Sequence, residues 1–268
     1  MPTTYAHQKF ASLVEEQLSE PPKQIIRQYP ELYELGLNGP DLFFFYVPYF
    51  YMNKVNRIGY GMHKEEFLPF LKSAAEVVRK DGFPAPELSY LYGFLTHFAL
   101  DRACHPYVYA TDALGEISHN EIESELDRDL MEQDGIDPLS AILTDKLVAS
   151  AETAEILSRF FPISTHQGKV TISCCKRYRN MIVTTSKAKR SFLYGLMHAC
   201  FVYDWMHGVI INLEPNPKCV ETNRVLEQQM LDAVPEAVSF IETFCDCANG
   251  TDEWSPLYHY DFCGKKWS

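Results

Sequence analysis

Hydrophobic side chains recur along this chain at the spacing of one helix face. Residues 4–18 illustrate the pattern, with apolar side chains at Tyr5, Phe10, Leu13, Val14 and Leu18. Apolar residues three or four positions apart are typical of an amphipathic α-helix, whereas a half-buried strand requires strict alternation. No alternating pattern persists beyond a few residues. We therefore predict an all-α protein, folded as a single multi-helix bundle over residues 1–268.

Turn signals divide this periodic pattern into segments. A double proline at 21–22 breaks the first stretch, and Asn-Gly-Pro-Asp at 38–41 is a strong turn signal in which Asp41 is well placed to cap the next segment. The connections are short, which favours one compact bundle. Helices are predicted over the approximate ranges 4–18, 23–35, 62–80, 86–105, 117–133, 151–160, 170–184, 187–210 and 220–247.

The longest uncharged apolar run, LFFFYVPYFYM at residues 42–52, is too short to cross a membrane. Eleven residues that include a proline do not span a bilayer core of about 30 Å, so no transmembrane segment is predicted. We interpret the run as buried core or as the wall of a pocket. The first residues, MPTTYAHQKF, lack the charged and apolar regions of a signal peptide, so we expect a cytoplasmic protein whose eight cysteines are reduced thiols.

Acidic residues outnumber basic ones, with 36 Asp and Glu against 24 Lys and Arg and a formal net charge of −12. Nucleic acids and anionic lipid surfaces attract basic proteins, so this balance argues against both as partners. One stretch is basic and contains no acid among its charged positions, Lys169, Lys176, Arg177, Arg179, Lys187, Lys189 and Arg190. We interpret it as a solvated helix face, and steering of a phosphate into a site is the alternative.

Three ionisable side chains occupy one stripe of a helix that is otherwise apolar. His97, Asp101 and His105 are four residues apart in the segment HFALDRACHPY. At about 3.6 residues per turn they lie on nearly one face. A buried Asp needs a partner, and no Lys or Arg stands three or four residues from Asp101. A metal ion that takes imidazole and carboxylate ligands would provide the missing positive charge.

A second pair of the same kind follows in the segment SHNEIESELD, where His119 and Glu123 are also four residues apart. Taken alone, either pair is more simply a helix ion pair worth a few tenths of a kcal/mol. Two such pairs and a further histidine within 27 residues favour a metal site.

Other histidines are isolated from acidic partners. His166 is predicted in a loop, and His198 and His207 are predicted as core residues of an aromatic helix. His259 has an acid only two residues away, which is not the spacing of a helix pair. We therefore exclude these four histidines from the candidate site.

The ordered set of candidate ligands resembles the zinc-dependent phospholipase C family, which shares its all-helical fold and trinuclear zinc site with the P1-type nucleases. The set is His7, Asp41, His63, His97-x-x-x-Asp101, His105 and His119-x-x-x-Glu123. The resemblance covers residues 1–130. Individually, His7 and His63 would be interpreted as surface or core histidines and Asp41 as a helix cap.

The resemblance implies roles for each of these residues. Its first zinc would be held by Asp41, His63, His97 and Asp101. A second zinc would be held by His105, His119 and Glu123. Asp101 would also bridge to a third, completed by His7 and the amino terminus of the chain. Asp41 would in addition be the general base for the attacking water.

The chain departs from the family pattern at two places. Secreted members begin with a Trp that binds the third metal, whereas this chain begins Met-Pro-Thr, so centres of two and of three zinc ions both stay open. The histidine of the second zinc usually lies six residues after the Asp, but His105 lies four after Asp101 and precedes Pro106. Because a residue before proline tends to leave the helical region, we expect the helix to end or kink at His105.

Paired zinc ions about 3.5–4 Å apart suit an in-line displacement at phosphorus. We therefore expect an intracellular zinc-dependent phosphodiesterase of the phospholipase C type, acting on a phospholipid head group or another small phosphodiester. The alternatives are a P1-like nuclease and a helical metal-binding protein without activity. The oligomeric state is not predicted. The aromatic side chains after Asp41 either wall its pocket or pack in the core; they are Phe43, Phe44, Phe45, Tyr46, Tyr49, Phe50 and Tyr51.

Overall fold

A computed structural model describes residues 4–47 and 52–267, and no β-strand occurs within these ranges. The predicted all-α class is confirmed. The α-helices are α1 (Thr4–Gln17), α2 (Glu20–Gln28), α3 (Pro30–Gly36), α4 (Lys54–Met62), α5 (Phe67–Lys80), α6 (Ala85–Asp112), α7 (His119–Gln133), α8 (Ala151–Phe160), α9 (Thr165–Ile182), α10 (Lys187–Ala199), α11 (Tyr203–Met206) and α12 (Val220–Asn249). Short 3-10 helices are η1 (Gly39–Phe45), η2 (His207–Val209), η3 (Pro217–Cys219) and η4 (Pro256–His259).

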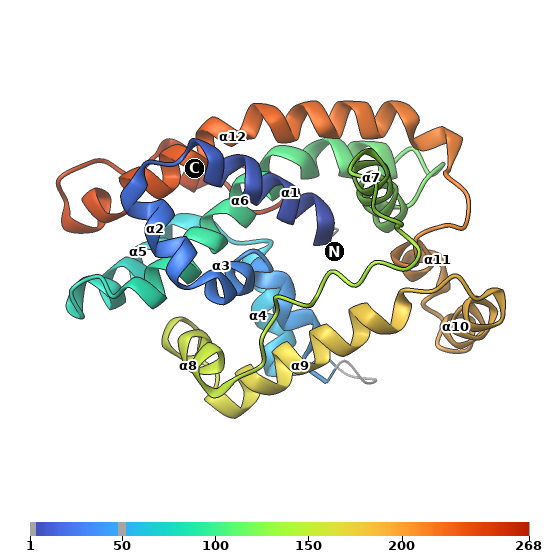
Figure 1. The fold of residues 1–268 in the computed structure, drawn as a ribbon, viewed down its shortest axis with the longest axis horizontal. Helices are drawn as coiled ribbons and strands as arrows, with labels where there is room; N and C mark the ends of the chain where they lie inside the picture. The colour runs from blue at the N-terminus through green and yellow to red at the C-terminus, as the bar shows by residue number, and fades with distance from the viewer. Residues whose placement is uncertain (1–3, 48–51, 268) are drawn as a thin grey trace.

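The long helices α6 and α12 organise the molecule. Figure 1 shows α12 running along one side above α6, with α9 along the opposite side and the first turn of α1 pointing into the space between them. Helix α6 packs most extensively against α3 and α12, and the buried apolar side chains form one continuous core. None of the helices in the described ranges is both long enough and apolar enough to span a membrane.

The crossing of α3 and α6 is held at backbone contact by two glycines. A Cβ on Gly36 would lie 2.1 Å from the carbonyl oxygen of Tyr90, and a Cβ on Gly93 would lie 2.2 Å from that of Tyr33. Glycine is required at such positions because any side chain would force the helices apart. This contact places the end of α3 beside the middle of α6, where His97 lies.

The turn after α3 places the carboxylate of Asp41 beside the middle of α6, near His97. Gly39 has φ 49°, and a Cβ there would lie 2.1 Å from the His97 ring. Asp41 follows inside η1, where the N-cap position is Asn38 and no side chain makes a capping hydrogen bond. The prediction that Asp41 caps a helix is therefore wrong, and its carboxylate is directed to other groups.

The predicted helix 23–35 has different boundaries in the structure, because proline can begin a helix as well as end one. The range 23–35 is divided at Tyr29, which leaves helical geometry before Pro30 begins α3. The double proline at 21–22 lies in the first turn of α2, where the missing N–H groups cost nothing, and so it begins a helix instead of breaking one.

The predicted range 62–80 contains only the last residue of α4 and then the whole of α5. Helix α4 was not predicted; it begins after Asn53, which forms a capping box with Asn56. His63 follows the last residue of α4, so it ends a helix instead of beginning one. Helix α5 starts only at Phe67.

Helix α6 continues through Pro106 to Asp112, so of the two expectations for His105, a helix end or a kink, the helix end is wrong. Proline removes the hydrogen bond to the carbonyl of Arg102. The backbone of Gly264 packs at this position, because a Cβ there would lie 2.9 Å from that oxygen and 2.4 Å from the Pro106 ring. The carboxy-terminal segment therefore covers the defect. The predicted helix 187–210 is also shorter in the structure: α10 ends at Ala199, and Phe201 shortly after it adopts φ 57°.

The aromatic run after Asp41 packs mainly inward. Phe43 is fully buried and meets Phe161 edge to face at 4.6 Å between ring centroids. Phe45 is buried as well, which confirms the core interpretation for this part of the run. Positions 48–51, including Tyr49, Phe50 and Tyr51, lie outside the described residues.

We expect Gly93→Ala to destabilise the protein by about 1–3 kcal/mol or more, because the added methyl group overpacks the α3–α6 contact. Gly195→Ala is the matched control: no atom lies within 4 Å of a Cβ at that position in α10, so the better helix former should stabilise by about 0.5–1 kcal/mol. Urea unfolding of both variants measures the difference. Equal unfolding free energies would contradict the close crossing.

Candidate metal centre

All eight predicted site residues converge at one place, although they come from five segments. Helix α1 contributes His7, η1 contributes Asp41, and His63 comes from the end of α4. Three residues come from α6 and two from α7, namely His97, Asp101, His105, His119 and Glu123. Six of the eight are buried, and His63 and His119 are partly exposed.

Asp101 lies at the middle of the first group. Its Oδ1 is 3.3 Å from Nε2 of His7, and its Oδ2 is 3.1 Å from Nε2 of His97. The rings of His7 and His97 stack with their centroids 4.3 Å apart, so they present their nitrogens side by side. The two oxygens of one carboxylate therefore face different imidazoles.

Glu123 is the acid of the second group. Its Oε1 lies 3.0 Å from Nε2 of His119 and 3.4 Å from Nε2 of His105. His105 also faces the first group, with Nδ1 3.7 Å from Oδ2 of Asp101. The two groups are therefore adjacent, and because α6 continues through Pro106, His105 lies on the same helix as Asp101 while it faces Glu123 of α7.

Asp41 and His63 adjoin the first group. Oδ1 of Asp41 is 3.0 Å from Nε2 of His63, which in turn is 4.0 Å from Oδ2 of Asp101. The tightest sets are His7 with His97 and Asp101, and His105 with His119 and Glu123, whose ligand atoms lie within 4.8 Å of one another in each set.

Backbone carbonyls orient three of the imidazoles. Nδ1 of His97 lies 2.9 Å from the carbonyl oxygen of Leu37, and Nδ1 of His105 lies 2.6 Å from that of Phe262. Nδ1 of His63 lies 2.7 Å from the carbonyl oxygen of Gly59. A carbonyl only accepts, so each Nδ1 donates and each neutral ring keeps a lone pair on Nε2. Metal-binding histidines are commonly oriented in this way.

Several buried polar atoms at this place lack a hydrogen-bond partner among the described residues. They include Nε2 of His97, Oδ2 of Asp101 and both carboxylate oxygens of Asp41. Buried polar atoms are nearly always paired, because an unpaired one costs about 1–3 kcal/mol. Lone pairs of imidazole and carboxylate that face one another across about 3 Å fit a shared cation, and this donor set suits zinc.

The pKa shifts of the site residues also favour a bound cation. Burial raises the pKa of Asp101, but His97 and His105 lower it more, so the net result is well below its usual range. Burial likewise opposes ionisation of Asp41, whereas His63 and His97 lower its pKa overall. Burial lowers the pKa of His105, yet Asp101 and Glu123 raise it to about 9. The carboxylates are thus ionised and demand positive charge from their surroundings.

The carboxy-terminal segment supports the site, which the sequence did not indicate. Phe262 is fully buried, and its ring lies 5.4 Å from that of His63 and 5.7 Å from that of His97. Asp261 holds this segment by accepting hydrogen bonds from the backbone N–H groups of Cys263 and Lys265. Because the contact to His105 uses a backbone carbonyl, no side-chain pattern could have revealed it.

Helix α7 also fixes the start of α1. The backbone N–H groups of Tyr5 and Ala6 donate to the two oxygens of Asp127, at 3.0 Å and 2.7 Å. A carboxylate at a helix amino terminus satisfies free N–H groups and matches the helix dipole. His7 follows within the same turn, so this contact sets its position relative to α7.

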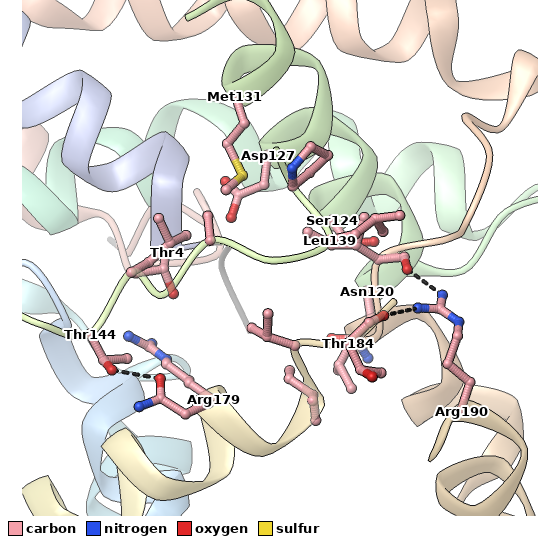
Figure 2. Close-up of a pocket in the computed structure, with 18 residues that line it drawn as sticks. Thr4, Asn120, Ser124, Asp127, Met131, Leu139, Thr144, Arg179, Thr184 and Arg190 are labelled. Carbon is pink, nitrogen blue, oxygen red and sulfur yellow. Dashed lines mark hydrogen bonds between the residues drawn. The ribbon is translucent and has the colours of Figure 1, made fainter. Parts of the chain in front are cut away.

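Two cavities lie near the candidate metal centre, and only the smaller one is lined by candidate ligands, whereas none of the eight lines the larger. The smaller one has an empty volume of about 240 Å³ and is lined by His7, Asp41, Glu34 and Arg179, among others. The larger is a solvent-open cleft of about 800 Å³, and Figure 2 shows its lining residues directed into it from α7, α9 and the segment between α7 and α8. Thr4 and Arg179 line both cavities.

The remaining histidines lie elsewhere, as predicted, but their surroundings differ. His166 lies in the first turn of α9 and is exposed, so its prediction in a loop is wrong. His198 is exposed and stacks on Tyr203, so its prediction as a core residue is wrong. His207 is partly buried, and His259 pairs with Glu66 at the surface.

Comparison with known proteins identifies a family for this chain. A family model described as zinc dependent phospholipase C matches residues 6–195 of the chain. The match spans more than half of the chain and includes all eight candidate ligands. It extends beyond residues 1–130, where the motif resemblance lies. No curated protein and no solved structure matches the chain.

We expect Asp101→Asn to weaken zinc binding by more than about 100-fold, because loss of even an outer hydrogen-bond partner of a ligand typically costs 10–100-fold. Asp232→Asn, at an exposed position of α12, is the control and should leave the zinc content unchanged. Elemental analysis after dialysis measures metal per chain. Full zinc content in Asp101→Asn would contradict the central position of this carboxylate.

Proposed function

This chain belongs to the zinc-dependent phospholipase C family, and on that premise we propose that it is a hydrolase that cleaves phosphodiesters at a zinc centre formed by the eight converging residues. The family match supports a phospholipase C-like hydrolase.

One observation carries the proposal: the carboxylate of Asp101 lies between imidazoles of two adjacent ligand groups. The proposed ligands of a first ion are Asp41, His63, His97 and Asp101, and those of a second are His105, His119 and Glu123. His7, which faces the other oxygen of Asp101, is the proposed ligand of a third. Bound zinc would stabilise negative charge on phosphate oxygens and lower the pKa of a water molecule.

Asp41 is the proposed general base. Its carboxylate is buried, its pKa is lowered overall by His63 and His97 despite burial, and it lines the smaller cavity. An ionised carboxylate that faces a cavity can accept a proton from a water molecule held there. Nδ1 of His63 donates to the carbonyl of Gly59, and its Nε2 lies 3.0 Å from Oδ1 of Asp41, so both side chains are placed to hold the same proposed ion.

The larger cleft supports a small or amphiphilic phosphodiester as substrate. Its lining includes Leu139, Leu143, Val183 and Ile211, so an apolar group of the substrate would find apolar surface beside the site. Such a lining suits a phospholipid better than a polynucleotide, whose successive phosphates require a basic groove. The formal net charge of −12 argues in the same direction.

We expect Asp41→Asn to lower kcat for phosphodiester hydrolysis by at least about 100-fold, the lower range of general-base catalysis. Asp204→Asn, exposed on α11, should retain wild-type kcat. Zinc content is measured alongside, because Asp41 is also a proposed ligand, and the His105–His119–Glu123 group should keep its ion. Activity of Asp41→Asn within threefold of wild type would exclude the role as base.

The substrate class is tested with three probes on zinc-loaded protein: bis-p-nitrophenyl phosphate, phosphatidylcholine vesicles and single-stranded DNA. We expect hydrolysis of the first two, abolished by chelation and restored by zinc. Cleavage of DNA alone would favour the P1-like alternative. Full zinc content without hydrolysis of any probe would favour a helical metal-binding protein without activity.

A further inference from the structure

Arg179 is the one basic side chain shared by the two cavities beside the candidate metal centre. It extends from α9 and lines the smaller cavity together with His7 and Asp41. It also lines the larger cleft, where Figure 2 shows it reaching from α9 toward the side occupied by Thr4. The guanidinium therefore lies at the junction between the cleft and the proposed ligands.

The guanidinium of Arg179 is positioned but has no carboxylate to neutralise it. Its Nη1 donates to Oδ1 of Asn38 at 2.5 Å, and its carbon lies 5.4 Å from the centre of the Phe45 ring. Over the described residues, neither a further hydrogen-bond acceptor nor a carboxylate oxygen within 4.0 Å is found for it. Several of its N–H donors are thus available to a ligand.

Three other partly or fully buried arginines have carboxylates or backbone carbonyls as partners. Arg159 pairs with Asp81 and Glu87. Arg128 pairs with Glu132. Arg190 also lines the larger cleft, but it donates to the backbone carbonyls of Thr184 and Ile211, as the dashed lines in Figure 2 show. These three guanidinium groups have structural partners, whereas Arg179 has only an amide and an aromatic ring.

Asn38 couples Arg179 to the metal-facing turn. Its Nδ2 donates to the carbonyl oxygen of Glu34 at 2.8 Å, which fixes Oδ1 toward Arg179. Asn38 also begins the turn that continues through Gly39 and a proline to Asp41. Gly39 packs on the His97 ring. One short segment therefore sets the position of Asp41 and of the guanidinium together.

Glu34 also lines the smaller cavity, but its carboxyl group has another hydrogen-bond partner. Its Oε1 accepts a hydrogen bond from Nε2 of Gln8 at 2.7 Å. Burial raises the pKa of its carboxyl overall, although the Gln8 hydrogen bond and Arg179 act against this. The Glu34 carboxyl therefore has a partner of its own, and it makes no ion pair with Arg179 among the described residues.

We propose that Arg179 forms an oxyanion-binding subsite beside the candidate metal centre, where its free N–H donors take a non-bridging oxygen of a phosphate group. A planar guanidinium binds phosphate through paired charge-assisted hydrogen bonds, and it keeps its charge at all relevant pH values. The identification of the anion as the phosphate of a phosphodiester rests on the proposed function. The subsite itself rests on the unneutralised guanidinium held at the edge of the cavity.

The test compares Arg179→Gln and Arg179→Lys with the control Arg177→Gln, whose side chain is exposed on the same helix. Calorimetry measures the binding of inorganic phosphate to each zinc-loaded protein, and bis-p-nitrophenyl phosphate hydrolysis gives KM and kcat. We expect Arg179→Gln to weaken phosphate binding and raise KM by about 10–100-fold, the loss of one hydrogen bond to a charged group. Arg179→Lys should recover part of the affinity, and Arg177→Gln should match wild type.

Zinc content and the urea midpoint should not change in either Arg179 variant, which separates ligand binding from a structural role. Phosphate affinity and KM of Arg179→Gln within twofold of wild type would overturn the subsite, as would an absence of phosphate binding by wild type. If wild type binds phosphate through Arg179 but hydrolyses no phosphodiester, the proposed function fails and the subsite stands. If hydrolysis is equal in all variants, the subsite fails and the proposed function stands.

Discussion

The burial of the Asp101 carboxylate among histidines is the interaction on which the rest of this structure depends. An ionised carboxylate in a protein interior is costly unless positive charge accompanies it. Here the imidazoles of His7, His97 and His105 surround it. Each imidazole can face the carboxylate with a proton, or with a lone pair when a cation lies between them. A centre of this kind is stable only as a set, because removing one charge leaves the others uncompensated.

The surrounding segments mainly fix the orientation of the site histidines. The glycine contact between α3 and α6 lets the carbonyl of Leu37 reach Nδ1 of His97, and the carboxy-terminal segment supplies the carbonyl of Phe262 to His105. Backbone acceptors are rigid, so they fix the ring orientation more firmly than a flexible side chain. The late part of the chain thus contributes to the site without contributing a proposed ligand.

The charge distribution explains how an acidic protein can receive an anion. Acids predominate overall, but none occurs between Glu155 and Asp204, and the helix that carries Arg179 lies within that segment. Arg179 is one of the basic residues of this segment, and it lines both cavities. A phosphate bound there would meet positive charge from the guanidinium and from the proposed zinc ions.

Local sequence determined the helical class and half of the candidate site. The pairs His97–Asp101 and His119–Glu123 are readable because residues four apart on one helix share a face whatever the rest of the fold does. Tertiary structure decided what depends on contacts between distant segments: that His7 meets Asp101, that α6 survives Pro106 under Gly264, and that Arg179 reaches the turn at Asn38. Those contacts are set by backbone approach and by the packing of whole helices, and neither leaves a periodic trace in the sequence.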